Sequence, residues 1–358
     1  MVMPLQKQQQ KLMNRSDPFV DDLHRLFFDE FDENHWHVFW NEMLKPPANW
    51  EEGDYHTRDG TRLRYVFSSC ANPKGLIMLL QGRAQSAHEY YDFIRRSHAE
   101  GYVVVTFDRR SHGQSDSFFI DGRTDHHIPD IMQQIQDVKG FISDVVKPSN
   151  FGHLSRALVG HSMGGAEGLI ALKDHSIAQD FSAAVYLAPM WAINLHDNRV
   201  FHHGLRIISP AIFNRQKRLG GMENRVLGRK PWSLQIEKDV FAARKTDDKV
   251  GQALQASITA LGLARQVGVP TYGTAYEILK LTKQIQHLQF YRDGTKIPSL
   301  SLLATNDLAN DTHVLTRLSE RFGMETHIMP GRHQTLNEVR PIRDSAYVRI
   351  FNFLKRHL

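Results

Sequence analysis

Short apolar segments recur along most of this chain, separated by stretches with helical spacing. Polar and apolar residues alternate over residues 61–67, which is typical of a half-buried strand. Residues 75–80 and 102–107 are almost continuously apolar, as in strands that are buried on both faces of a sheet. Residues 157–159 and 183–188 repeat this pattern. The chain therefore predicts several buried strands that belong to one sheet.

Helical patterns fill the segments between these strands and continue toward the C-terminus. Helices are predicted over residues 87–99, 128–146, 312–321 and 342–355, with further strands over 300–304 and 326–329. Strands that alternate with helices form parallel sheets with helices on both faces. The sequence thus predicts an α/β fold built on a mostly parallel sheet.

The alternation stops near residue 192 and resumes near residue 298. The residues between are irregular at first and then helical in pattern, with helices predicted over 254–267 and 272–288. An insertion between two strands of such a sheet lies at their carboxyl ends, above the ligand site, so we expect a helical cap. The expected division is an N-terminal helical extension (1–50), a core in two parts (51–192 and 298–358) and the cap (193–297).

The N-terminal extension carries its own helix signal. Asp17 followed by Pro18 is a typical N-cap and first helical position. Apolar residues then follow at helical spacing, with many acidic residues between them: Phe19, Leu23, Leu26, Phe27 and Phe31. Because a helix lying on a membrane would carry basic residues on its polar face, we expect this acidic helix to pack on the body of the protein.

Composition narrows the class of protein. With 358 residues, 41% hydrophobic and 23% charged, the chain matches a soluble globular protein with a sizeable core. No apolar run approaches the ~20 residues that span a bilayer, and residues 1–15 lack the apolar core of a signal peptide. Cys70 is the single cysteine, which excludes an internal disulfide. We therefore expect a reducing, cytoplasmic location.

Positive charge is concentrated in one part of the predicted cap. The whole chain has a formal charge of +5, and residues 215–230 hold a single acid, Glu223. The cations of this segment are Arg215, Lys217, Arg218, Arg225, Arg229 and Lys230. They could attract an anionic lipid surface or a phosphate headgroup, or they could belong to a solvated cap loop. We expect peripheral contact with the inner face of the cell membrane and no nucleic-acid partner.

One motif lies where a predicted strand gives way to a helix. Residues 160–164 read Gly-His-Ser-Met-Gly, with the apolar run 157–159 before them and the helix-forming run 166–172 after them. A strand, a sharp turn with a central serine and a helix are the context of a nucleophile elbow. The flanking glycines allow close strand–helix packing that a β-carbon would block. Ser162 is therefore the predicted nucleophile.

A serine hydroxyl needs a base to take its proton, and this elbow predicts that an acid and then a histidine follow in the chain. Asp307 follows the strand predicted over 300–304, and His333 lies in the loop after the strand over 326–329. His333 would be general base and then general acid, while Asp307 would fix its tautomer. Asp311 is the alternative acid.

The loop after the first buried strand is expected to supply half of an oxyanion hole. It reads Gln-Gly-Arg-Ala over residues 81–84. Gly82 lets the backbone approach closely, and the N–H of Arg83 is the predicted donor beside the N–H of Met163. Each such donor is worth roughly 3 kcal/mol in the transition state.

Taken together, these motifs resemble a known family. They are Gln81-Gly82-Arg83 with Tyr90 downstream, residues 107–115, the elbow, Ala188-Pro189-Met190, Val269-Pro270-Thr271-Tyr272, Asp307 and His333. From about residue 59 onward the chain resembles the monoacylglycerol lipases and bacterial lysophospholipases of the α/β-hydrolase superfamily, and residues 269–272 are closer to the lysophospholipase branch. The resemblance implies a triad of Ser162, Asp307 and His333, with oxyanion donors at Arg83 and Met163.

The chain departs from the family pattern at two places. Many members have His-Gly where this chain has Gln81-Gly82, and Ser111-His112 stands where a Gly-His pair or similar is usual. Neither change touches a triad residue. The first lies within the predicted oxyanion loop, which leaves the shape of that loop and of the acyl pocket open.

No metal or cofactor is expected. The pairs His126-His127 and His202-His203 lack the i, i+4 spacing with a carboxylate of hydrolytic zinc sites, and no Gly-x-x-x-x-Gly-Lys loop occurs. The leading hypothesis is a serine esterase that cleaves the carboxylic ester of a single-chain lipid, first of all a lysophospholipid. The same site could serve a monoacylglycerol lipase, a thioesterase or a general carboxylesterase. A catalytically silent lipid-binding scaffold is the non-enzymatic alternative.

Overall fold

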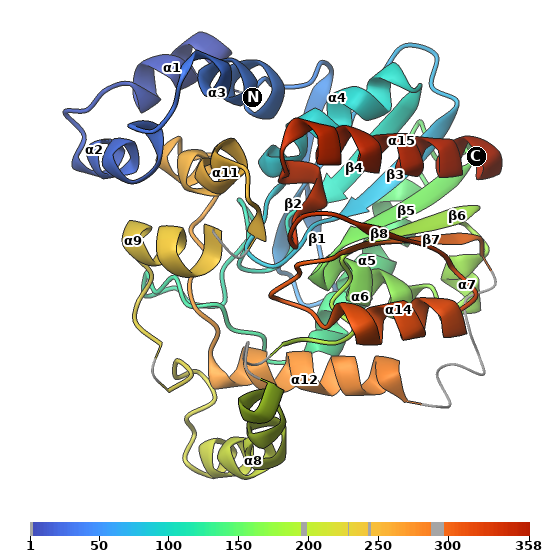
Figure 1. Ribbon diagram of the computed structural model, residues 1–358. Coiled ribbons are helices and arrows are strands. Elements are labelled where there is room, and N and C mark those ends of the chain that lie inside the picture. The colour runs from blue at the N-terminus through green and yellow to red at the C-terminus, as the bar shows by residue number, and fades with distance from the viewer. Residues whose placement is uncertain (1–2, 195–198, 228, 243–244, 288–296) are drawn as a thin grey trace.

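An eight-stranded sheet forms the centre of the protein in this computed structural model, which describes residues 3–194, 199–227, 229–242, 245–287 and 297–358 (Figure 1). The strand order is β1-β2-β4-β3-β5-β6-β7-β8. β1 and β2 pair antiparallel, as do β2 and β4, and all other neighbours are parallel. The strands are β1 (Trp50–His56), β2 (Arg62–Ser68), β3 (Gly75–Leu80), β4 (Tyr102–Phe107), β5 (Arg156–His161), β6 (Ala183–Leu187), β7 (Ser299–Ala304) and β8 (Glu325–Met329).

Helices cover both faces of this sheet. One apolar cluster joins the sheet to α4 (Tyr91–Ala99) and α15 (Arg340–His357). A second cluster on the other face joins it to α5 (Ile131–Phe141), α6 (Met163–Ala171) and α14 (Thr312–Arg321). Every residue of β3 to β7 is therefore buried, which explains their continuous apolar runs. The predicted fold class, a mostly parallel sheet with helices on both faces and an inserted helical cap, is confirmed.

Two core elements differ from what the sequence predicts. The sequence pattern does not predict β1, because most of its side chains are polar and exposed at the antiparallel edge of the sheet. The helix predicted from residue 128 begins at Ile131, where the side chain of Asp130 accepts the N–H of Met132 at 3.0 Å. It continues through a π-helical turn over Ile142–Val146. Short helical turns also occupy α7 (His175–Ala178), Ala87–Tyr90 and Thr335–Asn337.

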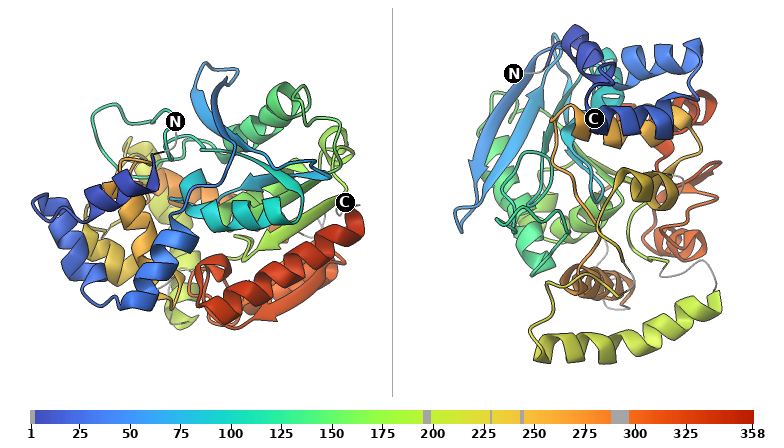
Figure 2. Two further views of the ribbon diagram at one scale, coloured as in Figure 1. Left: turned by 90° about the horizontal axis from the view of Figure 1, so that it is seen from above. Right: turned by 90° about the vertical axis from the view of Figure 1, so that its left-hand side faces the viewer.

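The chain between the neighbouring strands β6 and β7 forms helices above the sheet. They are α8 (Arg199–Arg218), α9 (Leu234–Ile236) with a π-helical turn at Glu237–Ala242, α11 (Lys249–Ala260) and α12 (Tyr272–Gln286). The expected irregular start is wrong, since α8 spans 20 residues. It lies against α12 on the side away from the sheet, as Figures 1 and 2 show. The helix predicted over 254–267 is shifted to Lys249–Ala260, because Asp248 caps its start and Gly262, with φ +72°, follows its end.

The N-terminal helices pack on the cap. They are α1 (Leu5–Leu12), α2 (Pro18–Leu23) and α3 (Glu33–Val38), with π-helical turns at His24–Phe28 and Phe39–Met43. Asp17 caps α2 by accepting the N–H of Phe19 at 2.8 Å, as predicted. Phe28 and Phe39 join Leu254 of α11 in one apolar cluster, so the acidic helix packs on the body of the protein as expected. None of the described helices combines the length and apolar character needed to cross a membrane.

Candidate active site

Ser162 occupies the sharp turn between β5 and α6. Its backbone has φ +50° and ψ −114°, a conformation that residues with a β-carbon rarely adopt and that is found at functional sites. A β-carbon at Gly164 would lie 2.3 Å from the carbonyl oxygen of Leu80. Only glycine therefore lets the turn pass this close to β3. The predicted strand–turn–helix arrangement is present at this serine.

His333 lies between Ser162 and Asp307. Its Nε2 is 2.9 Å from Ser162 Oγ, and its Nδ1 is 2.8 Å from Asp307 Oδ2. Asp307 follows β7 and His333 follows β8, so the side chains meet at the carboxyl ends of neighbouring strands. A carboxylate beside Nδ1 keeps the proton on that nitrogen, which leaves Nε2 to accept the serine hydroxyl proton.

The two candidate acids have different surroundings. Asp307 Oδ1 accepts the backbone N–H groups of Ala309 and Asn310 at 2.8 and 2.9 Å, which leaves Oδ2 for His333. Asp311 instead caps α14, where its Oδ1 accepts the N–H of Val314 at 3.1 Å. The structure thus brings Asp307, and not Asp311, to the histidine.

The loop that is predicted to supply an oxyanion donor, residues 81–84 (the oxyanion loop), follows β3 and is joined to the turn at Ser162. The carbonyl oxygen of Gln81 accepts the N–H of Gly164 at 3.1 Å. Ala84 has φ +62°, so the loop holds strain of the kind found at functional sites. The structure places Arg83 within this loop and Met163 at the first position of α6.

A buried polar group that the sequence patterns do not reveal connects this loop to the turn. Gln85 Oε1 accepts the N–H of Gly82 at 2.8 Å and the hydroxyl of Tyr90 at 2.6 Å, and it lies 2.7 Å from His161 Nδ1. Burial lowers the pKa of His161 to about 3, so its imidazole is neutral at physiological pH. Gly82, Tyr90 and His161 lie in the motifs found in the sequence, but no motif marks Gln85, the residue that joins them.

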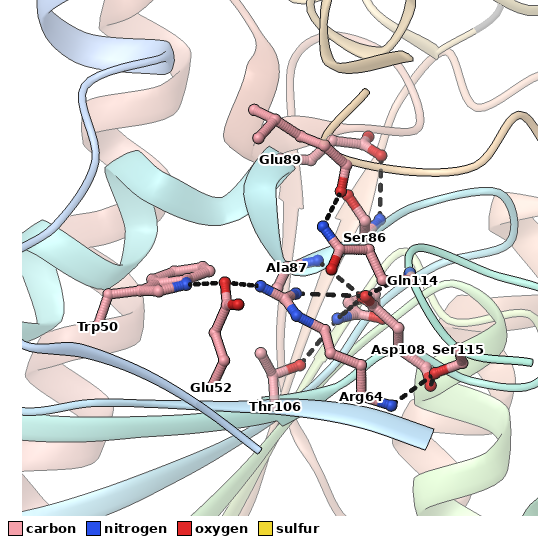
Figure 3. Close-up of polar contacts among 12 residues, drawn as sticks. Trp50, Glu52, Arg64, Ser86, Ala87, Glu89, Thr106, Asp108, Gln114 and Ser115 are labelled. Atoms are coloured by element: carbon pink, nitrogen blue, oxygen red, sulfur yellow. Dashed lines mark hydrogen bonds and ion pairs between the residues drawn. The ribbon is translucent and has the colours of Figure 1, made fainter. Parts of the chain in front are cut away.

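A second network, drawn in Figure 3, supports the start of the turn at Ala87–Tyr90. The carboxylate of Asp108 is fully buried after β4 and accepts the N–H groups of Ala87 and Gln114, each at 3.1 Å. Arg64 lies 3.3 Å from Asp108 and 2.5 Å from Glu52 of β1. The antiparallel edge of the sheet therefore helps to fix the segment that follows the oxyanion loop.

The two departures from the family pattern have local explanations. The side-chain amide of Gln81 hydrogen-bonds Thr106 Oγ1 of β4 at 2.9 Å, so this residue is anchored in the sheet. Ser111 has φ +62°, which a glycine would adopt without strain. Its hydroxyl oxygen accepts the N–H of Phe118 at 2.9 Å and so stabilises the turn.

The cap cations do not form one group. The exposed ones are Arg215, Lys217, Arg218, Arg229 and Lys230, of which the first three end α8. Arg225 instead pairs with Asp125, Nε to Oδ1 at 2.6 Å. Ile207 and Ile208 of α8 are 74% and 50% exposed. This helix thus presents both apolar and basic side chains to solvent.

The candidate metal-binding pair that the structure describes, His126-His127, does not belong to a cluster of metal ligands. Within the described ranges, no three His, Cys, Asp or Glu side chains are grouped to hold a metal ion. His127 Nδ1 lies 2.8 Å from Thr271 Oγ1. The fully buried ring of His126 packs edge-on against the ring of His112, and neither of its ring nitrogens has a hydrogen-bond partner among the described residues. The side chains of His202 and His203 lie outside the described residues. Burial raises the pKa of the Cys70 thiol.

A mostly parallel eight-stranded sheet, with a serine on the strained turn after β5 and an acid and a histidine after later strands, defines an α/β hydrolase. Within this superfamily the chain belongs to the family described as serine aminopeptidase, S33, which matches residues 71–340. This membership confirms the resemblance inferred from the sequence motifs.

Individual relatives agree with this assignment. A monoacylglycerol lipase of Mycolicibacterium smegmatis is 30% identical over 139 residues, which are 38% of this chain and 45% of that protein, so the match spans less than half of this relative. A soluble variant of monoglyceride lipase from Saccharomyces cerevisiae, solved with a substrate analog, has a TM-score of 0.68 at 16% identity and covers 87% of this chain and 97% of its own. A carboxyl esterase from Bacillus coagulans has a TM-score of 0.67 at 16% identity, with coverages of 86% and 98%. At these identities the structures show a shared fold.

Proposed function

We propose that this protein is a serine hydrolase that cleaves the carboxylic ester of a lipid with a single acyl chain. The observation that carries the proposal is the hydrogen-bonded line from Ser162 through His333 to Asp307, with the serine on a strained turn. Membership of the serine aminopeptidase S33 family supports a hydrolytic serine. The relative from Mycolicibacterium smegmatis, a monoacylglycerol lipase, supports a lipid ester as the substrate.

In the proposed reaction Ser162 Oγ attacks the ester carbonyl carbon while His333 Nε2 takes the hydroxyl proton. Asp307 stabilises the resulting imidazolium, and the N–H groups of Arg83 and Met163 stabilise the oxyanion. His333 then protonates the departing alcohol, and the acyl group remains on Ser162. Water attacks this acyl-enzyme with His333 again as base, which releases the fatty acid and restores the serine.

Among single-chain lipids we propose a lysophospholipid as the preferred substrate. Its phosphate would be attracted by the exposed cations at the end of α8. The guanidinium of Arg83 also lies at the base of the cap, where Nη1 donates to the carbonyl of Gly268 at 3.1 Å. A monoacylglycerol is the competing substrate, since the named bacterial relative acts on that class. Acyl-CoA thioesters and short-chain esters are the other candidates for this site.

A comparison of wild type with one variant tests the enzyme class and the substrate. Wild type and Ser162→Ala are assayed on a short-chain lysophosphatidylglycerol, the matching monoacylglycerol, an acyl-CoA and a p-nitrophenyl ester. We expect wild type to turn over the lysophospholipid and the monoacylglycerol. In Ser162→Ala the rate on both should fall by at least about 10³-fold. A folded protein that turns over none of these esters would instead favour the non-enzymatic lipid-binding scaffold.

The headgroup preference is tested by reversing the charge of the cations at the end of α8. Arg215→Glu/Lys217→Glu/Arg218→Glu should raise KM for the lysophospholipid about tenfold more than KM for the monoacylglycerol. The matched control reverses three exposed cations outside the cap: Arg58, Lys74 and Arg349. Equal effects on both substrates, or an equal effect of the control, would contradict the lysophospholipid proposal.

We further propose that the helices between β6 and β7 act as a cap that touches an anionic membrane surface from the cytoplasmic side. Exposed Ile207 and Ile208 lie on the same helix as exposed Arg215 and Lys217, so α8 combines the apolar and basic groups that bind such an interface. The proposed division of the chain has the cap at residues 193–297, the core at 51–192 and 298–358, and an N-terminal extension at 1–50. Sedimentation with phosphatidylglycerol vesicles, but not with phosphatidylcholine vesicles, is the expected result. Equal sedimentation with both would contradict an electrostatic contact.

A further inference from the structure

A buried ion pair lies directly behind the oxyanion loop. Arg109 follows β4 and Glu167 lies on α6, and the two side chains meet at 2.9 Å, Nη2 to Oε2. Their residues are only 4% and 1% exposed. A buried arginine is retained at this cost in desolvation only where its charge is paired and its donors are used. Arg109 also has N–H groups that do not contact Glu167, and two of these donate to other acceptors.

The guanidinium of Arg109 binds two consecutive carbonyl groups of the oxyanion loop. Its Nη2 donates to the carbonyl oxygen of Gln81 at 2.6 Å, and its Nη1 donates to that of Gly82 at 2.8 Å. The planar fork of an arginine matches two neighbouring acceptors in a way that a single ammonium does not. Both carbonyls are consequently drawn to the same side of the loop.

The direction of these carbonyls sets the direction of the N–H groups that follow them. In a planar trans peptide, the C=O and N–H bonds point in opposite directions. The peptide between Gln81 and Gly82 shows this, because its carbonyl meets Arg109 while its N–H donates to Gln85 Oε1 at 2.8 Å. In the next peptide, the carbonyl of Gly82 meets Arg109, so the N–H of Arg83 is turned to the opposite side.

The same ion pair connects the loop to the helix that begins after the nucleophile. Glu167 lies about one turn along α6 from Met163, the first residue of that helix. The carbonyl of Gln81, held by Arg109, also accepts the N–H of Gly164 at 3.1 Å. The same buried guanidinium is therefore linked to both segments that carry the proposed oxyanion donors, the loop and α6.

We propose that Arg109, held by Glu167, is a positioning residue that orients the Gly82–Arg83 peptide so that its N–H faces the oxyanion. Without it, the one remaining donor to the carbonyl of Gly82 among the described residues is the N–H of Gln85, at 3.4 Å, which is a weak restraint against a flip of the peptide. A flip would turn the carbonyl oxygen toward the developing negative charge. This inference rests on the proposed serine-hydrolase function and adds to it the group that holds the oxyanion loop in its working form.

The test compares variants that remove the Arg109–Glu167 ion pair (the clamp) with one that removes the neighbouring ion pairs of Arg110. Arg109→Met/Glu167→Leu removes both charges together, so that no unpaired charge stays buried, and Arg109→Lys keeps a charge without the planar fork. The control is Arg110→Met. Arg110 pairs with Asp59 and Asp137 at 2.7 and 2.6 Å, so this variant removes two ion pairs away from the loop. Active sites are counted by titration with a fluorophosphonate, and kcat and KM are measured per titrated site on a soluble ester.

Loss of the clamp should lower kcat about tenfold to a hundredfold while KM changes less than about twofold, because the oxyanion exists only in the transition state. The affinity for a trifluoromethyl ketone, which forms an oxyanion on the serine, should fall by the same factor. Arg109→Lys should lie between wild type and the double variant. Arg110→Met should lower the unfolding temperature while leaving kcat per site and ketone affinity at wild-type values.

Three results would overturn the inference: an unchanged kcat and ketone affinity in the clamp variants, a loss seen only in KM, or the same loss in Arg110→Met. If the double variant does not fold, Arg109→Lys decides, since wild-type kcat and ketone affinity in that variant reject the positioning role. Failure of the underlying function is recognised separately. In that case wild type itself neither reacts with the fluorophosphonate at Ser162 nor hydrolyses any ester.

Discussion

Replacing Asp307 by asparagine changes one atom of the proposed triad and tests how the histidine is held. Asp307 Oδ1 accepts the N–H groups of Ala309 and Asn310, and Oδ2 faces His333 Nδ1 at 2.8 Å. In Asp307→Asn the amide oxygen keeps the two backbone donors, so the NH₂ group faces Nδ1. That nitrogen must then be the acceptor, and the ring proton moves to Nε2. Since Nε2 lies 2.9 Å from Ser162 Oγ, the ring can no longer take the serine proton.

The size of the effect follows from the alternative orientation of the amide. Turning the amide oxygen toward His333 would leave the N–H groups of Ala309 and Asn310 facing an NH₂ group. Each buried N–H left without an acceptor costs about 1–3 kcal/mol, so the productive tautomer is disfavoured by about 2–6 kcal/mol. The imidazolium also loses the neighbouring negative charge. A loss of about 10⁴-fold in kcat, or about 5.4 kcal/mol, is therefore expected, in line with asparagine at this position in other serine triads.

The assay measures kcat and KM on a soluble p-nitrophenyl ester per folded protein, with unfolding by urea as a check on stability. The matched control is Asp311→Asn, because asparagine is about as good an N-cap as aspartate and α14 keeps its cap. The control should retain wild-type activity. Retention of more than about a tenth of the activity in Asp307→Asn, or an equal loss in Asp311→Asn, would refute the assignment of the acid.

Three further changes have defined outcomes. Burial raises the pKa of Glu89 from 4.5 to about 8, so between about pH 5 and 8 the folded state holds a proton that the unfolded state releases. The free energy of unfolding therefore falls over this range by up to ~1.4 kcal/mol per pH unit. Urea unfolding of Glu89→Gln should lack this slope. Gly164→Ala would place a β-carbon 2.3 Å from the carbonyl of Leu80, and the displaced turn should lower kcat about a hundredfold. Phe39→Ala, fully buried among the N-terminal helices, should cost about 3–5 kcal/mol of unfolding free energy with kcat per active site unchanged.

Each of these outcomes has a clear opposite. An identical pH slope in wild type and Glu89→Gln would mean that this carboxyl ionises normally in the folded protein. Wild-type kcat in Gly164→Ala would mean that the turn has room for a side chain. A lower kcat per site in Phe39→Ala would show that the N-terminal helices act on the catalytic centre as well as on stability.

The parts of the fold that follow from local patterns could be predicted from the sequence. Continuous apolar runs mark β3 and β4 because both faces of those strands are buried. The turn at Ser162 has no space for a β-carbon at Gly160 or Gly164, so glycine is required at both positions and marks the turn in the sequence. The order of serine, acid and histidine then restricts the partners to a few residues near later strand ends.

What the sequence could not predict depends on partners that are distant in the chain. The sequence predicts Asp307 as the acid but leaves Asp311 as an alternative, because both follow β7, and the positions of His333 and of the start of α14 separate their roles. No spacing of residues in the sequence predicts the clamp at Arg109. Its acceptors lie in the loop after β3, and its ion-pair partner lies on α6. α8 carries Pro210 within its length, a residue that usually argues against a helix interior.

The central claim, that Ser162 is an activated nucleophile, is tested most directly by covalent labelling. Wild type, Ser162→Ala and Asp307→Asn are treated with a fluorophosphonate, digested and mapped by mass spectrometry. One adduct per chain on the peptide containing Ser162 is expected in wild type, none in Ser162→Ala, and a much slower reaction in Asp307→Asn. A folded wild-type protein that forms no adduct, or forms it on another serine, would contradict the account.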